Sequence, residues 1–178
     1  MNSKFNAEGS KSKVDAEGSK EAKEAKSSRK KIIIVDDNMS YLSIVRNLLK
    51  PFYEVYPAPS AAKLFKLADK FIPDLVLLDV NMPVMNGFEA IEVLKENPRY
   101  KDIPVVFLTA KDDETSAMKG LELGASDYVT KPFYGPLLLR RISNILLIEQ
   151  QKRDLQSNNA TIVQLREQLE HESNQHSI

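Results

Sequence analysis

Short apolar runs alternate with amphipathic segments over residues 31–148. The runs are continuous, which is typical of strands buried on both faces of a sheet. The five runs are Ile32–Val35, Tyr53–Tyr56, Leu75–Leu78, Val105–Leu108 and Asp127–Val129. The segments that follow them have apolar residues at helical spacing. We expect helices near residues 41–49, 61–70, 87–96, 114–123 and 137–148.

Strands that alternate with helices along a chain predict a parallel sheet with right-handed crossovers. Two residues support the helix boundaries: Gly124 is suited to end the fourth helix, and Pro136 to the first turn of the fifth. We therefore predict an α/β, doubly wound domain of five βα units over residues 31–148.

The first thirty residues are mainly Ser, Lys, Glu, Ala and Gly, and the string Ala-Glu-Gly-Ser-Lys occurs in them twice. Such a segment buries too little apolar area to offset its conformational entropy. We predict a disordered, low-complexity tail over residues 1–30. A weak helix over Glu21–Lys26 is the alternative.

The last thirty residues are polar but contain a sparse apolar repeat. The apolar positions, seven residues apart, are Ile148, Leu155, Ile162 and Leu169, and Leu165 lies three residues after Ile162. Gln151 and Asn158 occupy the other core positions of this heptad pattern. We predict that the fifth helix extends through residues 149–178 as a coiled coil; a frayed, solvated extension is the alternative.

Composition limits the kinds of partner and location. The formal net charge is zero, so no broad basic surface is expected and direct binding to nucleic acid is not predicted. The chain has no cysteine, which excludes disulfides and thiolate metal sites. It has neither the apolar run of a signal peptide near its start nor a stretch long enough to span a membrane. We expect a soluble, cytoplasmic protein.

Polar residues follow the apolar runs where a parallel sheet places its functional sites. The first run ends in Asp36 and Asp37, the third in Asp79 and the fourth in Thr109, while Lys131 follows the fifth. Sites in open parallel sheets lie outside the carboxyl ends of the strands. We therefore expect three carboxylates to meet there, beside a hydroxyl and an ammonium group.

Three neighbouring carboxylates need a cation, because like charges raise one another's pKa. Oxygen ligands without His or Cys select a hard cation such as Mg²⁺, which commonly bridges carboxylates to phosphate. Asp79 could then act as a nucleophile that forms an aspartyl-phosphate. Taken singly, each residue has a structural explanation: Asp37 or Asn38 could cap a helix, and Lys131 could be a solvated lysine. Their joint occurrence at four strand ends favours a site.

Several short motifs are similar to those of response-regulator receiver domains and occur in the same order. They are Ile34–Asn38, Leu78–Pro83, Asn86–Gly87, Leu108–Ala110, Gly124–Tyr128 and Lys131–Phe133. The resemblance covers residues 31–148 and implies a flavodoxin-like (βα)5 fold with strand order 2-1-3-4-5. It implies a phosphorylatable switch of a two-component phosphorelay, and not an enzyme acting on other substrates.

The resemblance also implies a role for each matched residue. Asp79 would be the phosphoacceptor, and Asp36, Asp37, Asp79 and the backbone carbonyl of Asn81 would hold Mg²⁺. Asp36 would act largely through a coordinated water.

Thr109 and Lys131 would bind the phosphoryl oxygens. Thr109 and Tyr128 would form the switch, by moving inward together. Small Ala110 would leave access to the site, and Lys131–Pro132 would be a candidate cis peptide.

The implied phosphodonor is a sensor histidine kinase or a phosphotransfer protein. The implied output surface is formed by the fourth helix, fifth strand and fifth helix, and with the C-terminal helix it could form a homodimer. A phosphatase with an aspartate nucleophile would need a second acid where Asn81 stands, and Asp36–Asn38 would repel the phosphate of a flavodoxin-type cofactor. A degenerate scaffold is disfavoured by the intact site residues. Whether the chain acts alone or is part of a longer regulator stays open.

Overall fold

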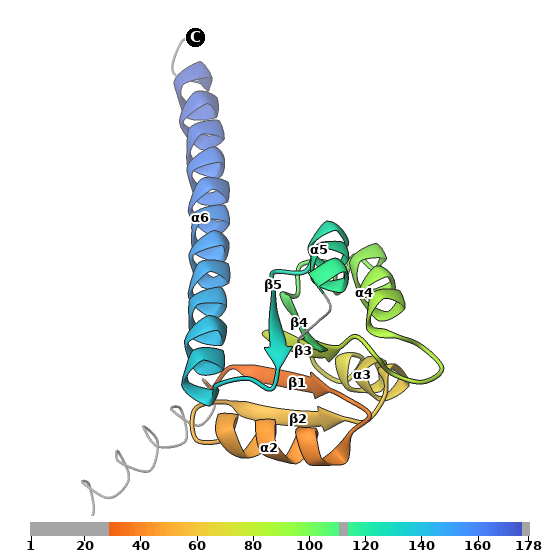
Figure 1. The fold of residues 1–178 in the computed structure, drawn as a ribbon. Helices are drawn as coiled ribbons and strands as arrows, with labels where there is room; N and C mark the ends of the chain where they lie inside the picture. The colour runs from red at the N-terminus through yellow and green to blue at the C-terminus, as the bar shows by residue number, and fades with distance from the viewer. Residues whose placement is uncertain (1–28, 111–113, 176–178) are drawn as a thin grey trace, which may run out of the picture.

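The computed structural model describes residues 29–110 and 114–175, and it contains each predicted strand and helix (Figure 1). The strands are β1 (Lys31–Val35), β2 (Glu54–Ala58), β3 (Leu75–Asp79), β4 (Val105–Ala110) and β5 (Asp127–Lys131). The helices are α2 (Met39–Leu49), α3 (Ala61–Ala68), α4 (Gly87–Glu96), α5 (Glu114–Glu122) and α6 (Gly135–Gln175). The predicted disordered tail lies, but for its last two residues, outside the described residues.

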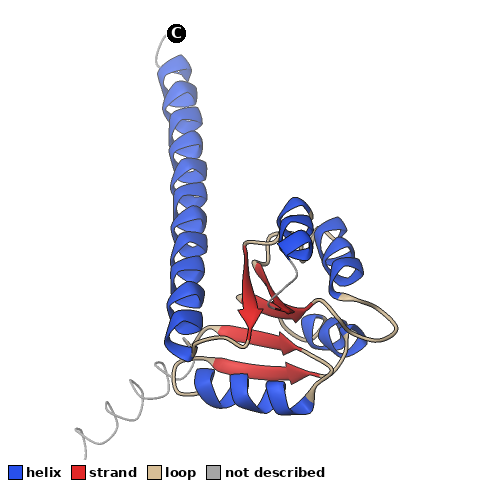
Figure 2. Ribbon diagram, in the orientation of Figure 1, coloured by secondary structure: helices blue, strands red, loops and turns tan. Residues whose placement is uncertain are grey.

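The five strands form one parallel sheet with the order β2-β1-β3-β4-β5 (Figure 2). This order confirms the doubly wound fold. The switch point lies between β1 and β3, because the chain leaves β1 towards one edge for β2 and crosses back to β3. The carboxyl ends of β1 and β3 are therefore neighbours.

Each face of the sheet carries its own hydrophobic core. Ile32 and Ile34 of β1 pack with α2 and α6 on one face, whereas Ile33 and Val35 pack with α3 and α4 on the other. All four side chains are fully buried, which explains the continuous apolar run. Burial on both sides fixes the register, since a slip of one residue would exchange the two faces.

The two edge strands differ slightly from the prediction. β2 begins one residue later than the apolar run suggests and continues through Pro57 to Ala58. Proline is tolerated there because β2 is an edge strand, and its mixed exposure weakens the sequence signal. β5 extends to Lys131, so this lysine ends the strand instead of following it.

Helix α6 has 41 residues and continues well past the domain, which confirms the predicted C-terminal extension (Figure 1). Its first turns pack on the sheet through Leu138, Ile142 and Leu146. Beyond them the helix runs away from the domain, and Leu155 is 63% exposed. No helix in the described part of the chain is both long enough and apolar enough to cross a membrane.

Candidate phosphorylation site

Three carboxylates meet at the carboxyl ends of β1 and β3. Asp36 and Asp37 follow β1 directly, and Asp79 is the last residue of β3. One carboxylate oxygen from each residue lies within 4.8 Å of the others. Asp36 and Asp79 are buried while Asp37 is exposed, so the cluster opens to solvent on one side.

Lys131 joins two of these carboxylates. Its Nζ atom lies 2.6 Å from Asp36 Oδ2 and 2.7 Å from Asp79 Oδ1, and both contacts are donated hydrogen bonds. The same ammonium lies 4.6 Å from the centre of the Tyr41 ring, a cation–π contact from α2. Lys131 is therefore held on three sides at the end of β5.

Burial and charge shift the pKa values of Asp79 and Lys131. Burial raises the pKa of the Asp79 carboxyl; Lys131 opposes this effect, and the charges of Asp36 and Asp37 add to it. Burial lowers the pKa of the Lys131 ammonium, but the hydrogen bonds to Asp36 and Asp79 and the negative charges of these two residues together outweigh burial and leave that pKa raised. One charged lysine thus faces three carboxylates, and the remaining negative charge favours the binding of a further cation.

Backbone groups fix the orientation of Asp36. Its Oδ1 atom accepts a hydrogen bond from the backbone N–H of Asn38 at 2.8 Å. The Asn38 side chain in turn caps α2 by accepting from the N–H groups of Ser40 and Tyr41. The helix cap is therefore Asn38 and not Asp37, which leaves the Asp37 carboxylate available to the cluster.

Gly87 is a site-shaping residue to which sequence reasoning gave no role. A Cβ atom on Gly87 would lie 2.3 Å from the backbone oxygen of Asp79 and 2.9 Å from Val80 Cα. The N–H of Gly87 also donates to Val80 O at 2.9 Å. Only glycine lets α4 begin this close to β3. The Asn86–Gly87 motif in the sequence could have indicated this role.

Thr109 lies near the end of β4 and is 1% exposed. Its hydroxyl donates to the backbone oxygen of Ala110 at 2.9 Å. The hydroxyl is thus engaged on its own strand and not on the carboxylates. Ala110 itself is exposed at the end of β4.

Tyr128 pairs in register with Phe107, two residues before Thr109, and its side chain is 37% exposed. It lines a small cavity of about 160 Å³ together with Pro132, Tyr134 and Leu137. The expected cis peptide is present between Lys131 and Pro132. Tyr128 is therefore outside the cluster, with a cavity beside it.

The donor set fits a hard cation. The described residues contribute only oxygen ligands to the cluster. Mg²⁺ in proteins is typically coordinated by oxygen atoms of carboxylates, water and phosphate. Asn81, the fourth predicted ligand, lies two residues after Asp79 in the loop between β3 and α4, and it is exposed. Of the four predicted ligands, the structure brings the carboxylates of Asp36, Asp37 and Asp79 together.

Comparison with known proteins identifies the family. The model of the response regulator receiver domain matches residues 32–143. The chain belongs to this family. It is a receiver domain homologous to those of phosphorylatable response regulators.

Two relatives show the range of proteins that contain such a domain. The transcriptional regulatory protein PhoP for alkaline phosphatase synthesis in Bacillus subtilis is 39% identical over 118 residues, covering 66% of this chain and 48% of PhoP. A probable cyclic di-GMP phosphodiesterase of Vibrio cholerae is 38% identical over 132 residues, covering 74% of this chain and 30% of the relative. The receiver chain thus spans less than half the length of either relative.

A solved structure agrees with the fold. The chemotaxis protein CheY4 of Vibrio cholerae superimposes with a TM-score of 0.63 at 31% identity. The match covers 66% of this chain and 99% of CheY4. This chain therefore has residues beyond those that match CheY4.

Proposed function

We propose that this receiver is a switch that accepts a phosphoryl group on Asp79, and not an enzyme acting on other substrates. The observation that carries the proposal is the meeting of Asp36, Asp37 and Asp79 within 4.8 Å, with Lys131 bridging two of them. The proposed donor is a phosphohistidine of a sensor histidine kinase or a phosphotransfer protein. The pathway is a two-component phosphorelay, and the proposed location is the cytoplasm.

In the proposed transfer an oxygen of the Asp79 carboxylate attacks the phosphorus atom of the phosphohistidine. The new O–P bond forms as the P–N bond breaks, and the imidazole leaves with the bonding electron pair. Burial excludes bulk water from Asp79, and Lys131 supplies positive charge where phosphoryl oxygens would lie.

Asp36, Asp37, Asp79 and the backbone carbonyl of Asn81 are the proposed ligands of Mg²⁺, with Asp36 acting through a water. When bound, Mg²⁺ would neutralise charge on the carboxylates and the phosphoryl oxygens. The carboxylates need such a cation because Lys131 balances only one of three negative charges.

The proposed switch is a change of hydrogen-bond partner at Thr109. Its hydroxyl would leave the Ala110 carbonyl and bind a phosphoryl oxygen, and Tyr128 would move inward into the space this opens. The change would alter the surface of α5, β5 and α6. That surface is the proposed output face.

Helix α6 is the proposed dimer element, and the receiver body (31–148) and the extension (149–178) are proposed to be distinct parts. Ile148, Leu155, Ile162 and Leu169 are between 47% and 65% exposed along one side of the helix. A helix of this length without tertiary contacts is poorly stable alone, and a second copy of α6 would bury this side as a coiled coil. No contact with nucleic acid is proposed for the dimer.

The experiment that tests the phosphoacceptor compares the wild type with Asp79→Asn by intact mass after incubation with acetyl phosphate. We expect a phosphate adduct that requires both Mg²⁺ and Asp79. A folded wild-type protein that gives no adduct in the presence of Mg²⁺ would contradict the proposal and leave a receiver-shaped scaffold.

A further inference from the structure

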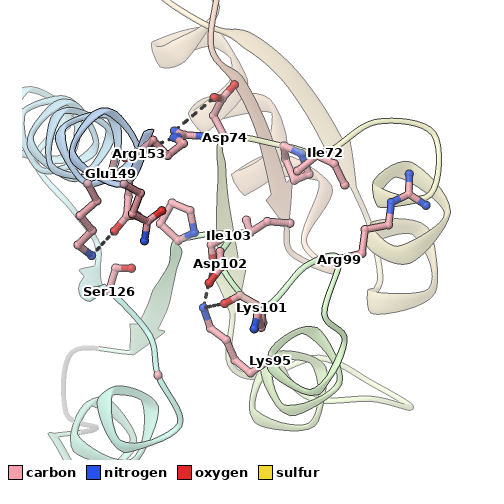
Figure 3. A pocket seen from close by; sticks show the side chains of 15 residues that line it. Ile72, Asp74, Lys95, Arg99, Lys101, Asp102, Ile103, Ser126, Glu149 and Arg153 are labelled. Carbon is pink, nitrogen blue, oxygen red and sulfur yellow. Dashed lines mark hydrogen bonds and ion pairs between the residues drawn. The ribbon is translucent and has the colours of Figure 1, made fainter. Parts of the chain in front are cut away.

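A second cavity, of about 550 Å³, lies at the end of the sheet opposite to the phosphorylation site (Figure 3). Its wall includes Asp74, Pro104 and Ser126, which immediately precede β3, β4 and β5. The facing wall is α6, from which Glu149 and Arg153 extend toward the cavity. The receiver body and the long helix thus enclose the cavity together.

The lining is rich in charge and has a positive excess. The cationic residues are Lys95, Arg99, Lys101, Lys152 and Arg153, and the acidic residues are Asp74, Asp102 and Glu149. The excess is two positive charges in a chain whose formal net charge is zero. An excess of one sign in a concave site attracts ligands of the opposite charge.

Two of the three carboxylates already have partners in the protein. Asp74 accepts from Lys30 Nζ at 3.0 Å and from the backbone N–H of Lys31 at 2.8 Å. Glu149 pairs with Lys152 at 2.7 Å. These carboxylates are therefore poor ligands for an incoming cation. The groups of the cavity that can bind a ligand are its hydrogen-bond donors.

The Lys95 ammonium can donate one more hydrogen bond. Its ammonium donates to the backbone oxygens of Lys101 and Ile103, each at 2.9 Å, and an ammonium has three N–H groups. Burial lowers the pKa of Lys95 and outweighs the attraction of Asp102 and Glu149, so the positive charge is incompletely balanced.

Two further cations are available. Lys101 makes no side-chain hydrogen bond or ion pair within the described residues. Arg153 lies 3.9 Å from Asp74, beyond hydrogen-bond distance, and gives only a 3.3 Å bond to the Glu149 carbonyl. Arg99 does not add to them, because it donates to the Asp69 carbonyl and lies at the outer edge of the cavity.

We propose that this cavity binds a phosphorylated small molecule such as a nucleotide. Its volume falls within the range of small-molecule sites, about 300–1,000 Å³. Lys95, Lys101 and Arg153 would donate to the phosphate oxygens. Ile72 and Pro73 provide an apolar wall that an organic group can contact and a free phosphate would leave unused.

The proposed site is distinct from Asp79 and would control α6 directly. Lys95 and Lys101 belong to the receiver body, whereas Lys152 and Arg153 belong to α6. A bound polyphosphate group would therefore tie the helix to the body at the point where the two separate. The ligand would stabilise the observed direction of α6 whether or not Asp79 is phosphorylated.

The test is calorimetric titration of the full chain with ATP, GTP, pyrophosphate and adenosine, in EDTA so that no Mg²⁺ is present. We expect ATP or GTP to bind more tightly than pyrophosphate, because a nucleotide also contacts Ile72 and Pro73. Adenosine should bind at least about tenfold more weakly than ATP, a difference of about 1.4 kcal/mol. The double variant Lys101→Ala/Arg153→Ala, which removes one proposed donor from the receiver body and one from α6, should lose about tenfold in affinity. The matched control Lys63→Ala/Lys66→Ala, which removes two exposed lysines from α3, should stay within about twofold of the wild type.

Asp79→Asn should bind the same phosphates as the wild type, which separates this proposal from phosphorylation. Absence of binding by every phosphate probe up to about 5 mM would overturn it. Equal losses in the two double variants would also overturn it, because they would show only general attraction to positive charge. So would equal affinity for adenosine and ATP.

Discussion

At the scale of residues, the candidate phosphorylation site combines three carboxylates with one lysine. Lys131 is 15% exposed and contacts Asp36 and Asp79, while Asp37 stays at the solvent edge. The residue types and strand ends could be predicted from sequence. The cation–π contact from Tyr41 could not, because it depends on how α2 lies beside β5.

Lys131→Met should destabilise the protein by roughly 3 kcal/mol at neutral pH, because it leaves buried carboxylates without their partner. Lys152→Met is the matched control and should cost less than about 1 kcal/mol, since its ion pair with Glu149 is exposed. Urea unfolding followed by circular dichroism measures both. Adding Mg²⁺ should recover part of the loss in Lys131→Met, and equal stability of the two variants would contradict the argument.

Gly87→Ala should lower the free energy of unfolding by about 2 kcal/mol and slow phosphorylation, because the new Cβ meets the Asp79 and Val80 backbones. Gly135→Ala is the control: its Cβ would meet only the flexible Leu48 side chain, at 3.1 Å. Chemical denaturation and the rate of adduct formation give the two readouts. A Gly87→Ala protein as stable and as reactive as Gly135→Ala would show that α4 can move away from β3 at little cost.

At the scale of elements, the apolar runs predicted the central strands best. β1 and β3 are buried on both faces, so their runs are unbroken, while β2 is half exposed at the edge and its signal began one residue early. α6 illustrates the other limit. Its heptad spacing predicted a long helix, but spacing alone does not state what covers the exposed side.

Asn158→Leu should strengthen self-association about tenfold, because it replaces a polar residue at a core position of the heptad pattern. Ser157→Leu adds the same side chain one residue away, outside the core positions, and should leave the association unchanged. Sedimentation equilibrium over a range of concentrations measures the dimer constant of each variant. Equal effects of the two substitutions would argue for general hydrophobic association and against a coiled coil.

At the scale of the whole molecule, the two candidate sites lie at opposite ends of one sheet, and α6 lines only the charged cavity. The carboxylate site could be predicted because its residues follow apolar runs. The charged cavity could not, since Lys95, Asp74 and Arg153 are far apart in sequence and ordinary as single residues. Only the direction in which α6 leaves the body brings them together.

The receiver body should fold and accept phosphate without the extension. The last residue of α6 in the buried core is Leu146, and contacts from beyond it to the body involve exposed or half-buried polar groups such as Gln150 and Arg153. A chain ending at Ile148 should therefore lose no more than about 1 kcal/mol of stability. It should still form the Asp79 adduct by intact mass, and light scattering should show a monomer. A truncated chain that unfolds would show that α6 stabilises the body, and one that still dimerises would move the dimer contact to the surface of α5, β5 and the first turns of α6.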